Sequence, residues 1–257
     1  MLNYIKSEFY RVFHGKNIYL MTLVLAALPI FYNFILYAFT KQSKNFPYGT
    51  TSFSFSTIVA NPMLFCYRAF IIYALLYEAD KRNGNLKNVI AYGISRTKVF
   101  AGQCVVSLAA SILMMVVVLS CYIISAMLLL ENAGPVKVHT IFTEVPAVLL
   151  IAIAALILGI VALNYFDSMI IGLITWYMIM FGIPTVLLYL GMKIDFIMNI
   201  AKWMPANFFK TEMQVNMSSC ITIWDSAEGM VKCLIAGLSG IAVFSFAGVL
   251  LLRKKEI

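Results

Sequence analysis

The stretch Val145–Phe166 reads VPAVLLIAIAALILGIVALNYF and contains no charged side chain. A hydrocarbon core of about 30 Å is crossed by roughly 20 apolar residues in a helix. This stretch is therefore long enough to span a membrane. A helix suits that environment because it satisfies its own backbone hydrogen bonds where no water is present.

Comparable runs recur along the 257 residues, of which 62% are hydrophobic and only 12% charged. Soluble domains carry about 25% charged residues. The runs do not alternate with the short period of a transmembrane β-strand. The sequence therefore predicts a single all-α membrane domain over residues 1–257, with six transmembrane helices at 18–39, 56–77, 100–130, 145–163, 168–191 and 231–252.

The distribution of basic residues predicts the orientation. With the N-terminus inside, eleven Lys and Arg residues fall in short inner segments and seven fall in longer outer ones. The positive-inside rule then places both termini in the cytoplasm. The net charge of +8 is accordingly attributed to topology and to contact with anionic lipid. We do not expect nucleic-acid binding.

Two amphipathic or aromatic segments flank the spans. In residues 2–16, apolar side chains recur at helical spacing, which predicts an interfacial helix; a simple charged anchor is the alternative. The segment 192–230 is predicted to lie outside and is rich in aromatic residues and Met. We expect one or two short helices on or dipping into the outer leaflet, or else an ordinary folded loop.

No catalytic motif is found in the sequence. His14 and His139 are its two histidines, and they fall on opposite sides of the predicted membrane. Gly15 and Lys16 resemble the end of a phosphate-binding loop, but Tyr10 stands where that motif requires Gly and Asn17 where it requires Ser or Thr. The chain is therefore predicted not to be an enzyme, and to bind no metal and no cofactor of its own.

Arg68 is the one charge deep inside an expected span. Such a residue costs about 2.5–3.5 kcal/mol on insertion scales and usually faces a bundle interior or a transport pathway. It is a candidate contact for an acidic or carbonyl group of a substrate. The alternative is a structural pair with a carboxylate or a helix carbonyl. The expected spans contain no carboxylate, which argues against a proton-coupled carrier.

Between the second and third spans lies the segment Glu78–Arg96, which reads EADKRNGNLKNVIAYGISR. Leu86, Val89, Ile90 and Gly93 recur at helical spacing, and Gly84 and Gly93 bracket a short helix over 83–92. An amphipathic helix of this kind can bind in a groove of a partner. A solvated basic loop is the alternative.

This segment resembles the first cytoplasmic loop of ABC-2 type transporter permeases. The likeness rests on Glu78, on the run Asn83–Lys87, on Tyr92–Arg96 and on the following Val99 and Phe100. It extends to the N-terminal helix, the six spans and the long outer segment. Gln103 departs from the family, in which many members have Lys at that position.

The resemblance implies the fold and the partners. It implies a permease of the bacterial cytoplasmic membrane that forms a dimer, with a separate ATPase subunit dimer that binds ATP and Mg²⁺. The predicted ATPase-coupling residues are Glu78, Lys81, Arg82, Gly84, Leu86, Val89, Ile90, Tyr92, Gly93 and Arg96. Smaller members resemble permeases for antimicrobial or cytolytic peptides, such as phenol-soluble modulins, and for bacitracin or lantibiotic immunity.

The sequence therefore predicts the transmembrane subunit of an ATP-driven exporter of amphipathic peptides. An exporter of lipid or glycan is the alternative with the same architecture. An ATP-independent secondary carrier and a membrane-embedded enzyme are further alternatives.

Overall fold

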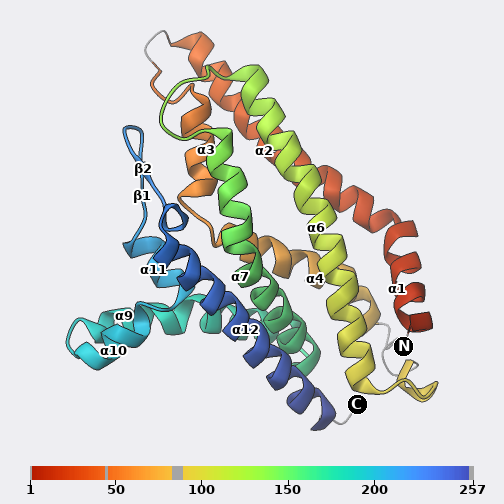
Figure 1. The fold of residues 1–257 in the computed structure, drawn as a ribbon. Coiled ribbons are helices and arrows are strands. Elements are labelled where there is room, and N and C mark those ends of the chain that lie inside the picture. Colours follow the sequence, from red (N-terminus) through yellow and green to blue (C-terminus); the bar gives the residue numbers. More distant parts are fainter. Residues whose placement is uncertain (1, 44–45, 83–88, 255–257) are drawn as a thin grey trace.

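The structure, a computed structural model, describes residues 2–43, 46–82 and 89–254, with side chains for all of these but 78–82 and 254. It is almost entirely helical (Figure 1). The long helices are α1 (Leu2–His14), α2 (Lys16–Gln42), α4 (Leu64–Arg82), α6 (Arg96–Leu129), α7 (Val138–Tyr165) and α12 (Ala227–Lys254). The shorter elements are α3 (Thr51–Val59), α8 (Met169–Tyr177), η1 (Met178–Gly182), α9 (Ile183–Gly191), α10 (Asp195–Ala201), α11 (Pro205–Thr211), β1 (Gln214–Val215), β2 (Cys220–Ile221) and η2 (Ile223–Asp225).

Five helical runs within the described residues are long and apolar enough to cross a membrane. They are Lys16–Gln42, Arg96–Leu129, Val138–Tyr165, Met169–Gly191 and Ala227–Arg253. A sixth candidate is the pair Thr51–Val59 and Leu64–Tyr77, two helices that are bent by 70° relative to each other. The predicted all-α membrane architecture is thereby confirmed.

The structure differs from the expectation of an uninterrupted second span over 56–77. Helix α3 begins five residues earlier, at Thr51, and ends at Val59, before α4 starts at Leu64. Pro62 lies in the gap. A proline disfavours helical geometry in the residue before it, here Asn61. The expected helix is therefore divided into two.

The predicted fifth span also contains an irregularity. Its middle, Met178–Gly182, is a π-helical turn, and Pro184 follows at the start of α9. Proline lacks the N–H that a regular helix would use at this point. Beyond this turn, α9 and α10 lie side by side and project sideways from the bundle in Figure 1.

Helix α7 is the centre of the bundle. It packs along α12 and also contacts α4, α6 and α8. The close approach of α12 depends on glycines. A Cβ added at Gly237 would lie 2.4 Å from the Cβ of Leu150, and one added at Gly240 would lie 2.9 Å from the Cβ of Ala154. Small residues at such crossings are a common way for membrane helices to pack.

Helix α1 packs against the start of α6. The ring of Tyr4 lies over Gly102, where an added Cβ would be 2.6 Å from Cε1 of Tyr4. Val12 is buried, and Ile5 and Phe9 are partly buried in the same cluster. The predicted apolar face of the helix thus packs on the bundle. A position at the membrane surface stays a prediction.

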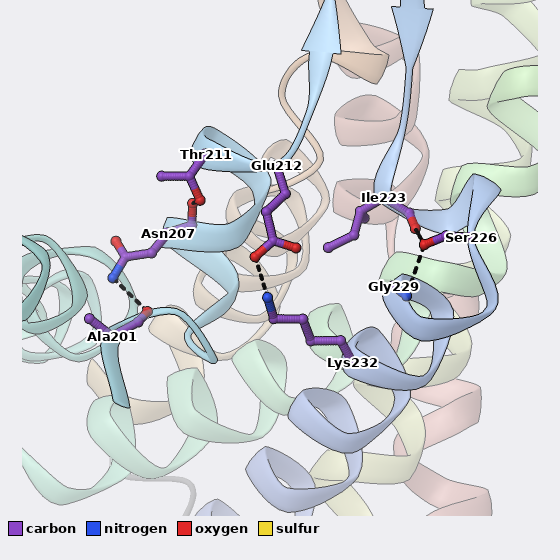
Figure 2. A network of polar contacts seen from close by, with 8 residues as sticks. All are labelled: Ala201, Asn207, Thr211, Glu212, Ile223, Ser226, Gly229 and Lys232. Carbon is purple, nitrogen blue, oxygen red and sulfur yellow. Dashed lines mark hydrogen bonds and ion pairs between the residues drawn. The ribbon is translucent and has the colours of Figure 1, made fainter. Parts of the chain in front are cut away.

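The segment 192–230 folds into α10, α11, a two-stranded hairpin and η2, where the sequence predicted one or two short helices or else an ordinary folded loop. Figure 2 shows that Lys232 of α12 forms an ion pair with Glu212. The same ammonium group lies 5.8 Å from the ring centroid of Trp203 and 5.3 Å from that of Phe208. Nδ2 of Asn207 donates to the carbonyl of Ala201 at 3.0 Å. These contacts fix the segment to the head of α12.

The helix bundle has two ends, which we call the N/C end and the loop end. The N/C end carries the start of α1 and the end of α12, where both chain termini are marked in Figure 1. The loop end carries residues 46–50 and 131–137 together with the β1–β2 hairpin. Helix α2 runs from the N/C end to the loop end, and α3 followed by α4 returns.

Candidate functional site

The half-helix α3 is held from within the bundle by a buried polar cluster. Oγ of Ser54 donates to Oδ1 of Asn33 on α2 at 2.6 Å and contacts the hydroxyl of Tyr122 on α6 at 3.0 Å. Nδ2 of Asn33 donates to Oγ of Ser125 at 2.8 Å and to the carbonyl of Tyr122 at 3.2 Å. Asn33 and Ser54 are fully buried. Each polar group therefore depends on its partners in the other two helices.

The start of α3 is also tied to the loop end. The backbone N–H of Thr51 donates to the carbonyl of Glu131 at 2.9 Å, and that of Val136 donates to Oγ of Ser52 at 3.0 Å. Gly134 adopts φ +100, and a Cβ there would lie 2.4 Å from the Cβ of Ser52. Only glycine fits both that backbone conformation and that space. Helix α3 is thus fixed at its start and along its length.

Helix α4 leads away from the break as one continuous rod. Its 19 residues, Leu64–Arg82, extend over about 28 Å at the usual rise per residue. Phe70 stacks on Trp176 of α8 with ring centroids 4.6 Å apart, and Nε1 of Trp176 donates to the carbonyl of Ala155. The far end of α4 enters the segment predicted to contact an ATPase. This helix therefore connects the break to the predicted coupling segment.

A cavity of about 70 Å³ lies between α2, α4, α6 and α7, beside the first turns of α4. Sixteen residues line it, and the only two with polar side chains are Arg68 and Ser111. The guanidinium of Arg68 lies 5.7 Å from the ring centroid of Phe65. Within the described part of the chain, no carboxylate lies within 4 Å of it. Among the described residues Arg68 thus has no direct ion pair, and its role in a substrate pathway stays a prediction.

Glu144 is a buried carboxylate that the sequence interpretation placed outside the spans. Helix α7 begins at Val138, so Glu144 lies in its second turn and is completely buried. Neither of its carboxylate oxygens has a hydrogen-bond partner. In its ionised form it would be attracted by the guanidinium of Arg68 on α4. The expectation of spans without a carboxylate is therefore wrong, because the helix extends beyond its uncharged stretch.

Gln103 connects three helices near the N/C end. Its Oε1 accepts a hydrogen bond from the hydroxyl of Tyr73 on α4 at 3.3 Å and another from Nδ2 of Asn164 on α7 at 2.7 Å. Gln103 is almost fully buried. A neutral acceptor suits this place, because both neighbours donate to it. The residue that departs from the family pattern is thus a link between α4, α6 and α7.

The predicted coupling segment is described only in part. Gly84 and Leu86 lie outside the described residues, as do the side chains of Glu78, Lys81 and Arg82. Residues 89–91 are helical, with Val89 and Ile90 half-buried. The segment therefore has a helical end where the sequence predicted a helix, and its role stays a prediction.

A tight turn separates this helical end from α6. Tyr92 is 88% exposed, and Gly93 has φ +83. The N–H of Gly93 donates to the carbonyl of Ile90 at 2.9 Å. Helix α6 then begins at Arg96. The predicted exit turn at Gly93 accordingly uses the left-handed backbone conformation that glycine adopts readily.

A comparison with known protein families covers most of the helices described above. The family model described as ABC-2 family transporter protein matches residues 4–182, which is more than half of the chain. The matched range runs from α1 through the broken span, the coupling segment and α7 to the π-helical turn. No curated protein and no solved structure matches the chain. The chain belongs to the ABC-2 family of transporter proteins.

Proposed function

We propose that this chain is the permease subunit of an ATP-driven exporter, and that its cargo is an amphipathic peptide of the antimicrobial or cytolytic kind. The family establishes a membrane component of an ABC transporter. The observation that supports coupling to an ATPase is the continuity of α4. This helix joins a cavity inside the bundle to the predicted partner-binding segment without a break.

In this proposal a separate ATPase dimer binds ATP and Mg²⁺ and receives the helix 83–92 in a groove. Movement of that helix is carried by α4 toward the cavity. ATP binding favours one arrangement of the helices, and hydrolysis resets it, through a difference in affinity between two states. Glu78 and Arg96 hold the ends of the segment. Among the described residues, Val89, Ile90 and Tyr92 are the proposed direct contacts.

The remaining parts of the proposal concern assembly and orientation. A second copy of the permease completes the pathway, since twofold pairing is the commonest symmetry of oligomers. Both termini face the cytoplasm of a bacterial cell, so the hairpin β1–β2 faces outward. Arg68 contacts an acidic group of the cargo in the cavity. Surrounding lipid covers the exposed apolar faces of the bundle.

Co-purification with the cognate ATPase tests the coupling segment. The substitution Tyr92→Asp adds a charge on the proposed contact surface and is expected to abolish co-purification and ATP-dependent export. Tyr48→Asp is the matched control, because Tyr48 is also exposed but lies in the loop between α2 and α3. Retention of the ATPase by both variants would exclude this contact.

Transport in liposomes tests the energy source and the cargo. We expect uptake of a labelled amphipathic peptide into inside-out vesicles only when the ATPase and ATP are present. Activity of vesicles that hold this chain alone would establish the secondary carrier instead. Movement of a labelled lipid or glycan, without movement of the peptide, would keep the exporter and replace the proposed cargo.

A further inference from the structure

The cavity beside α4 has the composition of a site for one acidic group on an apolar chain. Its wall is apolar apart from Arg68 and Ser111. The hydroxyl oxygen of Ser111 is buried and has no hydrogen-bond partner. The guanidinium of Arg68 likewise has no carboxylate within 4 Å in the described part of the chain. Two donors therefore face a shared space whose other walls suit hydrocarbon.

The size of the cavity limits what it can hold. One water molecule needs roughly 10–15 Å³ of this kind of volume. The cavity's 70 Å³ therefore has room for about five waters. That is enough for a carboxylate with a few carbon atoms and far too little for a whole amphipathic helix. The occupant is accordingly the end or one side chain of a larger molecule.

The chemistry of the two donors selects a carboxylate. Arginine presents a planar fork of donors that matches both oxygens of a carboxylate. Serine can add one further donor to the same group. In an apolar surrounding these interactions are stronger than in water. A neutral amide at the same place would lose the attraction between opposite charges.

Glu144 is a second carboxylate that acts on the same arginine. It is completely buried, its oxygens have no hydrogen bond, and in its ionised form it attracts the guanidinium of Arg68. A buried carboxylate is strongly destabilised unless a cation or donors compensate it. Glu144 does not line the cavity, so it does not occupy the space of a ligand. It competes only for the charge of Arg68.

We propose that Arg68 and Ser111 form a carboxylate site for the acidic end of the transported amphiphile, and that Glu144 is the internal carboxylate that displaces it. The cargo in this proposal rests on the peptide exporter proposed above. In one arrangement the guanidinium holds the ligand. In the other it turns to Glu144, and the ligand is released.

The position of Arg68 in α4 makes such an exchange feasible with small movements. Arg68 is about 6 Å from the start of α4, whereas Arg82 is about 27 Å from that start, at about 1.5 Å per residue. If α4 pivots at the break, a shift of about 5 Å at its far end moves Arg68 by only about 1 Å. A shift of that size changes hydrogen-bond partners without removing Arg68 from the cavity.

Equilibrium binding tests the site in the full chain, reconstituted in phosphatidylcholine nanodiscs. The probe is a fluorescent amphipathic helical peptide with a free C-terminal carboxylate, and the comparison is the same peptide with a C-terminal amide. Charge-assisted hydrogen bonds contribute enough for a preference of about tenfold for the free acid. We expect this preference to fall to about one in Arg68→Gln. A ratio near one in the wild type would overturn the proposal.

Two further variants separate the roles of Ser111 and Glu144. Ser111→Ala is expected to weaken binding of the acid several-fold and to leave the amide unchanged. Ser120→Ala, an exposed serine on the same helix, is its control. Glu144→Gln is expected to strengthen binding of the acid about tenfold, because the competing charge is gone, whereas the exposed Glu131→Gln has no effect. An unchanged affinity in Glu144→Gln would refute the competition.

The remaining outcomes are also decisive. If Glu144→Gln does not fold, Glu144→Asp keeps the charge at shorter reach and should also strengthen binding of the acid. Displacement of the peptide by phosphatidylglycerol, but not by added phosphatidylcholine, would assign the site to a lipid phosphate and overturn the peptide carboxylate. Peptide export that persists with an acid-to-amide ratio of one would remove this site and keep the proposed function. A tenfold preference for the acid without ATP-dependent export would keep this site and remove the proposed export function.

Discussion

The buried cluster around Asn33 offers a direct test of how the broken span is held. We consider the substitution Asn33→Leu, which keeps the size of the side chain and removes all its polar atoms. Asn33 is fully buried and lies between α3 and α6. Its amide makes three hydrogen bonds, to Ser54, Ser125 and the carbonyl of Tyr122. All three are lost in the variant.

The expected loss of stability follows from these three bonds. Hydrogen bonds between membrane helices contribute about 0.6 kcal/mol on average and up to about 1.7 kcal/mol. Three of them therefore contribute about 2 kcal/mol. The hydroxyls of Ser54 and Ser125 keep other partners, Tyr122 in both cases. The variant consequently leaves few orphaned groups, and the loss should stay close to this sum.

Unfolding by sodium dodecyl sulfate in mixed micelles, followed by circular dichroism, measures this loss. Asn17→Leu is the matched control, because Asn17 is exposed on the same helix. We expect the control to change the free energy of unfolding by less than about 0.5 kcal/mol. A loss in Asn33→Leu no larger than that of the control would refute the view that the cluster holds α3.

Two further changes test the packing of α1 and the orientation of the chain. Gly102→Ala should lower the free energy of unfolding by about 1–3 kcal/mol, because the new Cβ would meet the ring of Tyr4. The second change Tyr4→Ala should restore the stability. A double variant that stays as unstable as Gly102→Ala would contradict this packing. Cys220 lies in β2, outside the candidate spans, and should react with a membrane-impermeant maleimide from the outside of intact cells, with Cys220→Ser as control. Burial raises the pKa of this thiol, so labelling should be slow near neutral pH and accelerate as the pH rises; labelling only from the inside would reverse the topology.

The spans could be predicted from the sequence because the bilayer imposes a length and an apolar composition on each of them. The same reasoning explains what was missed at Glu144. A search for uncharged stretches begins this span after its last preceding charge, so a charged residue in the first turns of the helix falls outside it. Helix α7 extends six residues before Glu144, to Val138. The sequence gives no residue spacing that would show this carboxylate to be buried.

The break between α3 and α4 could have been predicted from the sequence, but the apolar composition around it favoured one continuous span. Asn61 and Pro62 lie inside the apolar run, and proline disfavours helix in the residue before it. The expected span began at Ser56, so most of the hydroxyl-rich stretch Thr51–Thr57 fell outside it. Those hydroxyls instead find partners on α2, α6 and the loop end. Such partners are distant in the sequence, so only the folded structure identifies them.

The distance of a charged residue from the break determines how far that charge moves when α4 moves. In the proposed mechanism α4 pivots at residues 60–63, because the Asn33 cluster and Glu131 hold α3 in place. A charged residue near the far end of α4 would travel several ångströms with the coupling segment and leave its cavity. Arg68 lies close to the pivot, so it moves by about an ångström while it stays among the same neighbours. A small displacement can then exchange one carboxylate for another without exposing the guanidinium to lipid, where a charge is strongly disfavoured.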